Sequence, residues 1–307
     1  MENIVHQGTI GSATWTLNRE GTLTIYQGEW DNQTYVYYQP WRAYATEILQ
    51  VDGRASFILK GDAKGLFEKL PNVKEIDLSG WNTKDVWDMT CMFQRCPNLT
   101  TLNLSSWDTS QVKSMRMMFR NCVALEKIEL LDWKTENVED FSYMFQDCVS
   151  LLALDVSHWD VSKAVTLCRM FQGCSNLKTI EVGSWNTRNA KDMSWMFHRC
   201  SHVKELDVSH WDTKNVVYMS WMFFDCSSLE FLDVAHWNTE NVESMCWMFY
   251  NCLSLETLNV AHWNTSRVWD MHNLFMNCKH LLALNLSHWD TAGVKNMSEM
   301  FYGCTDL

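Results

Sequence analysis

Apolar residues recur along most of the chain in a fixed order that repeats every 26 residues. The most regular apolar position holds tryptophan, at Trp81, Trp107, Trp133, Trp159, Trp185, Trp211, Trp237, Trp263 and Trp289. A fixed period of this length indicates one supersecondary unit stacked on copies of itself. The pattern therefore predicts a solenoid whose repeated units together present an extended surface.

Each repeat divides into two segments that have different hydrophobic periods. In the first segment, Leu102 and Leu104 alternate with polar residues, which predicts a short β-strand with one buried face. The next residues, Asp108–Ser110, predict a turn and a helix N-cap. The second segment has apolar residues at i, i+3, i+4 and i+7, which is one stripe of an α-helix, as at Met115, Met118, Phe119 and Cys122. Because helices are wider than strands, we expect the strand face to be concave.

Residues 1–60 lie outside the repeat and are predicted to form a β-rich N-terminal cap. Within them, Thr14–Leu17 and Gly21–Ile25 alternate around a polar link, which predicts a β-hairpin. Residues 61–307 are predicted to form the solenoid, with one half repeat and nine 26-residue repeats. The last repeat ends at Leu307 without a cap, so we expect fraying or end-to-end self-association there.

The repeats also carry the motifs of a known family. The run L-x-x-L-x-L-x-x-W at 99–107 resembles the leucine-rich-repeat consensus. With the motif W-[DN]-T-x-x-V-x-x-M-x-x-M-F-x-x-C at 107–122, 211–226, 237–252 and 289–304, the chain resembles the BspA-like leucine-rich-repeat surface proteins of bacteria. We therefore predict an α/β fold, a leucine-rich-repeat-type solenoid of parallel strands and short helices, and the parallel crossovers predict a right-handed turn. The resemblance implies surface display and adhesion to host proteins or cells.

Composition and charge narrow the range of partners. The 307 residues carry a formal net charge of −12, which disfavours nucleic-acid binding because phosphate contacts need a Lys/Arg surface. No apolar run approaches the roughly 20 residues that span a bilayer, so no membrane insertion is expected. The start, Met1–His6, does not have the pattern of a signal peptide. We expect a cell-surface or secreted location from the resemblance, with a cytoplasmic location as the alternative.

The cysteines and histidines do not predict a cofactor or a metal site. Nine of the 12 cysteines follow the repeat and lie on the apolar stripe, which indicates reduced thiols in the core. Cys91, Cys168 and Cys246 fall outside that phase. Five histidines directly precede a periodic tryptophan, and we interpret them as a turn residue duplicated with its repeat, with a metal-binding column as the alternative: His158, His210, His236, His262 and His288.

Several aromatic and apolar residues fall on the side of the predicted helices that faces away from the buried stripe. Polar residues are expected there, so these residues predict a partner-binding surface on the convex face. They are Trp195, Val217, Trp221, Phe224, Trp247, Tyr250, Trp269 and Met276. The alternative is that the predicted helices are short or irregular and that these tryptophans wedge between neighbouring repeats.

A second candidate surface lies on the predicted strands. Acidic residues occupy one outward position in successive repeats, and we predict partner binding on the concave face at Asp155, Glu181, Asp207 and Asp233. A solvated polar ladder is the alternative. Close carboxylates also suit glycoside hydrolysis, so an enzyme using Glu181 and Asp207 is a rival hypothesis.

The sequence favours a non-catalytic recognition or adhesion protein on a bacterial cell surface. Its expected partner is a protein, a matrix component or a cell. A carbohydrate-binding module that stacks exposed tryptophan on sugar rings is one alternative, and an intracellular interaction scaffold is another.

Overall fold

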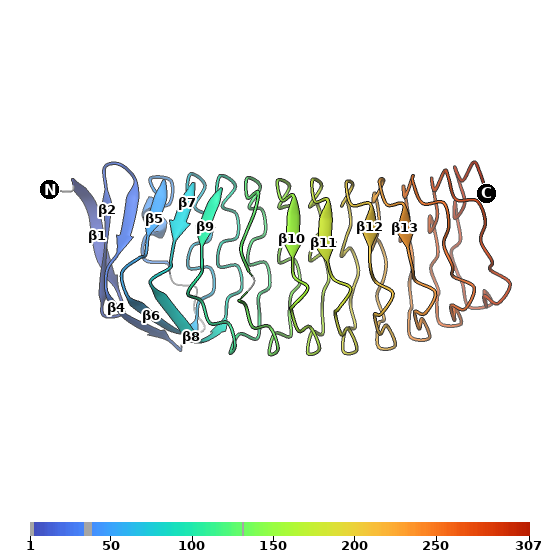
Figure 1. The fold of residues 1–307 in the computed structure, drawn as a ribbon, viewed down its shortest axis with the longest axis horizontal. Coiled ribbons are helices and arrows are strands. Elements are labelled where there is room, and N and C mark those ends of the chain that lie inside the picture. Colours follow the sequence, from blue (N-terminus) through green and yellow to red (C-terminus); the bar gives the residue numbers. More distant parts are fainter. Residues whose placement is uncertain (1–2, 34–38, 131) are drawn as a thin grey trace.

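The computed structural model describes residues 3–33, 39–130 and 132–307. The chain forms an elongated β-solenoid in which successive 26-residue repeats, called rungs below, lie side by side from one end to the other (Figure 1). Parallel bridges join equivalent residues of neighbouring rungs, from Asp88↔Ser114 to Asp270↔Asn296. The prediction of a solenoid with a 26-residue period is therefore confirmed.

The N-terminal end opens with an antiparallel sheet. β1 (Ile4–Ile10) pairs with β2 (Ala13–Asn18), which pairs with β3 (Thr22–Ile25). The β2–β3 pairing confirms the predicted hairpin. β3 then pairs in parallel with β5 (Gln50–Asp52), so the sheet of the cap continues directly into the solenoid. The domain boundary at residue 60 stays a prediction.

Parallel strands line one side of the solenoid and shorten along the chain. The first sheet has the order β1-β2-β3-β5-β7-β9, where β7 is Glu75–Asp77 and β9 is Thr101–Asn103. Later rungs contribute β10 (Ala153–Asp155) paired with β11 (Thr179–Glu181), and β12 (Glu205–Leu206) paired with β13 (Phe231–Leu232). The middle residues of β10 and β11 are buried between exposed neighbours, which confirms the predicted alternation.

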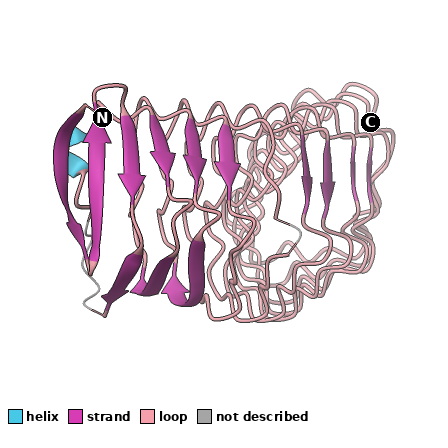
Figure 2. Ribbon diagram, turned by 60° about the vertical axis from the view of Figure 1, so that its left-hand side comes forward, coloured by secondary structure: helices cyan, strands magenta, loops and turns pink. Residues whose placement is uncertain are grey.

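A second parallel sheet lies near the N-terminal end, on another side of the first rungs. It joins β4 (Gly28–Asn32), β6 (Phe57–Asp62) and β8 (Trp81–Asp88). Beyond β8, loops and turns form that side of the solenoid (Figure 2). The regular fold therefore depends on contacts between rungs more than on long strands.

The prediction of short helices is wrong. Among the described residues the one helix is a single 3-10 turn, η1 (Arg42–Tyr44). The segment predicted to be helical is a series of turns that we call the turn wall, defined as residues 114–122 and their equivalents in the other rungs. Asp108 also does not cap a helix, because its carboxylate accepts a hydrogen bond from the Ser110 amide at 3.0 Å in a local turn. The fold is a β-solenoid and not an α/β solenoid.

Backbone hydrogen bonding explains how the turn wall keeps a helical spacing without a helix. The amides of Met115 and Met117 donate to the carbonyls of Asp140 and Ser142 in the next rung at 3.0 and 2.9 Å. The next amide, that of Met118, donates to the Met115 carbonyl within its own rung at 3.2 Å, and the Phe119 amide again donates to the next rung, at Met144. Amides thus alternate between the neighbouring rung and an i→i+3 turn, whereas every helical amide bonds within its own segment. The turns still place the apolar residues of the stripe inward.

The core consists of columns, meaning sets of equivalent residues 26 positions apart. Phe93 and Phe119 stack at 5.6 Å with an interplanar angle of 1°, and this phenylalanine column continues through the solenoid. The periodic tryptophans form a second column, in which the Trp211 indole donates to the Val182 carbonyl at 3.1 Å. The periodic thiols form a third, in which Cys122 donates to the Phe93 carbonyl at 3.2 Å. The predicted core position of the tryptophans and the periodic cysteines is confirmed.

Within the described residues, no helix has the length and apolar character that crossing a bilayer requires. Because no helices form the turn wall, the reason for expecting a concave strand face no longer applies. We therefore refer to the two candidate surfaces as the turn wall and the strand face.

Candidate functional site

Two columns of the turn wall hold residues in the left-handed backbone region. One contains mainly residues that tolerate this conformation, including Asn121, Gly173 and Asn251. The other places bulky residues there in successive rungs, with Met117, Tyr143 and Arg169 at φ values of 57°, 62° and 58°, followed by Trp195, Trp221 and Trp247 at 62°, 65° and 60°. Such a conformation costs about 1–3 kcal/mol for each side chain of this kind. Backbone preference therefore does not explain the three tryptophans.

These tryptophans form part of a surface cluster of six stacked rings. The cluster, called the aromatic plate, contains two parallel columns: Trp195, Trp221 and Trp247 in one, and His198, Phe224 and Tyr250 in the other. Successive tryptophan centroids lie 4.4 and 4.8 Å apart, with interplanar angles of 6° and 11°. In the second column the corresponding distances are 4.6 and 4.5 Å.

Charged and polar groups border both ends of the tryptophan column. The Arg169 guanidinium lies 4.2 Å from the centre of the Trp195 ring and 5.5 Å from that of Tyr143. At the other end, the Trp247 indole donates to Nε2 of His272 at 2.5 Å. The N-terminal border of the plate is therefore cationic, and the opposite border is held by a hydrogen bond.

The stacking determines which part of each ring meets solvent. Trp221 has a tryptophan against each face, and Trp195 has Trp221 on one face and the Arg169 guanidinium over its ring. Both indoles remain partly exposed, so solvent meets mainly their edges. At Trp195 and Trp221 the plate therefore offers ring edges and not a free indole face.

The residues predicted for the convex surface divide between three columns. Five of them belong to the plate, in which Trp195, Trp221, Trp247 and Tyr250 are half-buried, whereas Phe224 is buried and is not the exposed residue that was expected. Half-buried Met276 follows Tyr250 in the same column. Val217 and Trp269 occupy another column, in which Trp269 is 47% exposed.

The alternative holds in part, because the part of the turn wall that the structure describes has no α-helix and the tryptophans of neighbouring rungs stack on one another. Among the described residues, the hydrophobic core includes the neighbouring Phe197, Phe223 and Phe249 but none of the plate tryptophans. The tryptophans contact their own column and the second column of the plate. The plate is therefore an external layer on the turn wall.

His198 is the one imidazole in the plate. It is 4% exposed, it stacks on Phe224, and its Nδ1 has no hydrogen-bond partner. Burial, followed by the charges of Arg199 and Arg169, lowers the pKa of His198 to about 4. The imidazole is therefore neutral at physiological pH and acts as an aromatic member of the plate.

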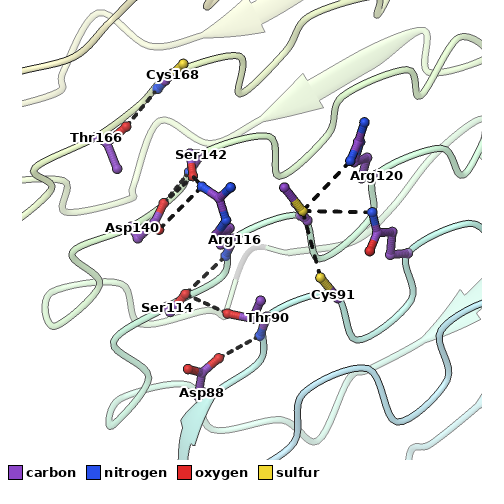
Figure 3. Close-up of polar contacts among 12 residues, drawn as sticks. Asp88, Thr90, Cys91, Ser114, Arg116, Arg120, Asp140, Ser142, Thr166 and Cys168 are labelled. Carbon is purple, nitrogen blue, oxygen red and sulfur yellow. Dashed lines mark hydrogen bonds and ion pairs between the residues drawn. The ribbon is translucent and has the colours of Figure 1, made fainter. Parts of the chain in front are cut away.

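Polar residues form a ladder beside the plate on the same wall. In its N-terminal part the Asp88 carboxylate accepts from the Thr90 amide at 2.8 Å, and Thr90 bonds Ser114 at 2.8 Å in the next rung (Figure 3). Further along, Arg116 donates to Ser142 at 2.6 Å, and Ser142 donates to Asp140 at 2.5 Å (Figure 3). The ladder thus consists of two columns whose side chains satisfy one another.

The strand face holds a separate groove of about 880 Å³ across the rungs of β11 and β12. Its lining includes Glu181, Gly183, Lys204 and Asp207. A Cβ atom on Gly183 would lie 2.5 Å from a carboxylate oxygen of Asp207, so glycine leaves the room that this carboxylate occupies. A hydrogen bond from the Ser209 hydroxyl, at 2.7 Å, lowers the pKa of Asp207.

The four acidic residues predicted for the strand face do lie on its outer side. Asp155, Glu181 and Asp207 are exposed, and Asp233 is half-buried. Glu181 and Asp207 border the same groove, whereas Asp233 lines smaller hollows beside exposed Phe231. The structure brings only part of the predicted ladder into one site.

Sequence reasoning missed three features of the turn wall. His198 was not included in the candidate surface, although it precedes Phe224 and Tyr250 in their column by one and two rungs. The Arg169 border was missed because a cation–π contact between rungs leaves no local motif. The proximity of Cys246 and His272 was also missed, although they are 26 residues apart and so equivalent in neighbouring rungs.

Comparison with solved structures finds similar chains among bacterial repeat proteins. A leucine-rich cell surface protein from Faecalibacterium prausnitzii A2-165 is 14% identical, with 99% of this chain and 93% of that chain covered and a TM-score of 0.37. An internalin from Listeria monocytogenes str. 4b F2365 is 11% identical, with coverages of 95% and 88% and a TM-score of 0.27. A leucine-rich-repeat protein from Bacteroides ovatus ATCC 8483 is 15% identical, with coverages of 98% and 93% and a TM-score of 0.25.

A search of curated proteins finds no significant match. A family model described as "Mycoplasma protein of unknown function, DUF285" matches residues 62–178, 149–253 and 219–307, which together cover the solenoid. The resemblance to BspA-like proteins by name stays a prediction. On the extent of this match, the chain belongs to the DUF285 family.

Proposed function

We infer that this protein is a non-catalytic recognition protein that binds a protein partner through the aromatic plate and is displayed at a cell surface. The observation that carries this inference is the stack of Trp195, Trp221 and Trp247 outside the hydrophobic core. Clusters of partly exposed aromatic residues of this kind are typical of binding surfaces. The cell-surface location rests on the resemblance of the repeat motifs to bacterial surface proteins.

The backbone of the tryptophan column is left-handed in every rung from Gly65 to Glu299, so the residue types are what distinguish this part of the column. Position 273, one rung after Trp247, holds Asn273 in the same left-handed conformation, and position 65 holds Gly65. These residue types fit the turn without the steric cost that a bulky residue has. Met117, Tyr143 and Arg169 adopt the same conformation in earlier rungs, so the strain belongs to the fold, and the feature that favours a binding role is the run of three large rings in consecutive rungs.

The ring geometry favours a protein over a glycan as the partner. A sugar stacks on an aromatic ring through the face of that ring, and Trp221 has both faces covered by neighbouring indoles. Ring edges and the half-buried Tyr250 instead suit apolar side chains, with a hydroxyl for hydrogen bonding. Trp221 therefore offers no free ring face to a sugar, which counts against the carbohydrate-binding hypothesis at the centre of the plate.

The border of the plate indicates the charge of the partner. Arg169 stacks on Trp195, and Arg199, which follows His198 in the chain, has a side chain that is 64% exposed and lies 3.7 Å from the Asp225 carboxylate. An arginine can contact an aromatic ring and still donate to a carboxylate. We expect the partner to present apolar side chains flanked by an acidic residue at this border.

The test is a binding assay with immobilised matrix proteins and whole cells, each with and without enzymatic removal of glycans. A glycan array is probed in parallel. Purified wild-type protein should bind a protein target, keep that binding after deglycosylation, and give no signal on the array. The variant Trp195→Asn/Trp221→Asn/Trp247→Asn should lose binding, because asparagine fits the left-handed position but removes the rings. Binding that disappears with the glycans, or that the variant retains, contradicts the proposal.

A second candidate function rests on the strand-face groove. Glu181 and Asp207 supply carboxylates to the groove, which Lys178 and Lys204 also line, and Lys204 donates to Glu230 at 2.8 Å at its margin. The groove therefore suits a polar ligand that pairs with these carboxylates. The variant Glu181→Gln/Asp207→Asn removes these charges and leaves the aromatic plate intact. Loss of binding in that variant alone would favour the groove as the recognition surface.

A further inference from the structure

The two columns of the polar ladder contain different residue types near the C-terminal end of the solenoid. In one, Asp140 and Asp192 precede Asp270, and in the other, Ser142 and Ser194 occupy the position of His272. The serine of each earlier pair donates to its aspartate, at 2.5 Å for Ser142 and 2.6 Å for Ser194. His272 replaces the hydroxyl with an imidazole.

Cys246 completes a three-residue group. It precedes His272 by one rung in the same column, so stacking of the rungs brings its thiol next to the imidazole and the Asp270 carboxylate. One ligand atom from each of Cys246, Asp270 and His272 lies within 4.8 Å of the other two. Among the described residues this is the one such grouping of three potential metal ligands.

We propose that Cys246, Asp270 and His272 form a binding site for Zn²⁺ or a chemically similar transition-metal ion. A thiolate, an imidazole and a carboxylate are the ligand types that zinc takes in proteins. Calcium and magnesium prefer all-oxygen sites and do not suit this set. With zinc–ligand bonds of about 2.0–2.3 Å, tetrahedral ligand atoms lie about 3.3–3.7 Å apart, so small side-chain rotations bring the group to that geometry.

The surroundings of the group suit a bound ion. Cys246 and Asp270 are buried, and the His272 side chain is 26% exposed, so the imidazole provides the path to solvent. Burial raises the pKa of the Cys246 thiol, while hydrogen bonds with Ser220 and Ser244 act in the opposite direction. A metal ion displaces the thiol proton to solvent and neutralises the buried thiolate and carboxylate.

The hydrogen bonds of His272 indicate which nitrogen would bind. The Trp247 indole can only donate, so Nε2 of His272 is the acceptor and Nδ1 carries the proton. Nδ1 therefore donates to Asp270 at 2.6 Å. A metal at Nδ1 takes the place of that proton, and the neutral ring then carries its proton on Nε2. The indole of Trp247 loses its acceptor, which couples the metal site to the edge of the aromatic plate.

The test uses the full chain, reduced and freed of metal, with Zn²⁺ and Co²⁺ as probes. Metal bound after dialysis should amount to one ion per chain, and Co²⁺ should give the charge-transfer absorption of a thiolate ligand. Three variants take the residue that stands in an equivalent position of another rung: Cys246→Ser, Asp270→Asn and His272→Ser, as in Ser220, Asn296 and Ser298. Each should weaken zinc binding at least about tenfold, and Cys246→Ser should also abolish the thiolate band.

The matched control is Cys168→Ser. Cys168 occupies the same column and is buried, but its neighbour in the next rung is Ser194 instead of a histidine. This control should keep wild-type metal binding. Metal binding that is equal in all variants, or Co²⁺ that binds wild-type protein without the thiolate band, overturns the proposal. Because the spectrum of wild-type protein alone can refute it, the test does not depend on the folding of a variant.

Discussion

Replacing His198 with phenylalanine should remove most of the acid sensitivity that this histidine confers on the fold. Phenylalanine is the residue of the next rung at this position, Phe224, so the variant extends a ring column that already exists. In the wild type, burial lowers the pKa of His198 to about 4, from an ordinary value of 6.5. Between these values the unfolded chain binds a proton that the folded chain does not bind.

The magnitude follows from the two pKa values. Stability from this group is present in full above the unfolded pKa and is lost as the pH falls through the window between about 6.5 and 4. Between pH 7 and pH 5 the free energy of unfolding should decrease by about 2 kcal/mol on account of His198 alone. His198→Phe should not lose this stability. The difference in free energy of unfolding between wild type and variant should therefore change by about 2 kcal/mol between pH 7 and pH 5.

The assay is urea unfolding at pH 7 and pH 5, followed by circular dichroism and fluorescence. A control variant, His202→Ser, removes an exposed histidine and takes the residue that Ser228 supplies in the next rung. It should keep the wild-type loss of stability. If wild type and His198→Phe lose equal stability between the two pH values, His198 is not held neutral in the plate, and the argument from its burial is refuted.

Three further predictions test the packing and the backbone of the rungs. Phe223→Ala removes a ring of the phenylalanine column and should lower the free energy of unfolding by about 3–5 kcal/mol in urea titrations, and a loss below 1 kcal/mol would show that this column is not tightly packed. Thr213→Val removes the hydroxyl that donates to the Asn238 carbonyl at 2.9 Å, and the same titration should show a loss of about 1–3 kcal/mol. Asn251→Ala and Asn251→Gly both remove the side-chain hydrogen bonds with Asp225 and Asn277, so they should differ only by the backbone cost of alanine at a φ of 58°, which should make the alanine variant about 1 kcal/mol less stable than the glycine variant in the same titration.

The repeat and its core were predictable from the sequence because each buried position has one role in every rung. Leu154 and Ile180 face inward on their strands, and the periodic tryptophans and cysteines lie in continuous columns, as their spacing predicted. A strict period leaves little freedom, since a shift of one residue would expose every member of a column.

The helices could not be excluded from the spacing alone. Residues at i, i+3, i+4 and i+7, such as Met115, Met118, Phe119 and Cys122, face one side both in a helix and in this series of turns. What differs is the partner of alternate amides, which lies 25 residues away in the next rung. The sequence does contain a signal for these turns, since a second column rich in asparagine, aspartate and glycine suits the left-handed conformation.

Part of the candidate surface was predicted from the sequence, although the helical-wheel argument behind that prediction assumed α-helices that the described part of the turn wall does not contain. The helical wheel placed Trp195, Trp221 and Trp247 outside the core, and the turn wall does so as well. The wheel also predicted that Phe224 is exposed, whereas contact with His198 and Tyr250 buries it. Contacts between rungs decide this burial, and they become visible only when the repeats are aligned by column.

The measurement that tests the central claim most directly is the position of a bound partner on the solenoid. A photo-crosslinking amino acid is placed at Arg199, beside the aromatic plate, or at Glu181, on the strand face, and each protein is irradiated with the target found in the binding assay. We predict crosslinks from position 199 and none from position 181. Crosslinks from position 181 alone would contradict the assignment of the aromatic plate as the recognition surface.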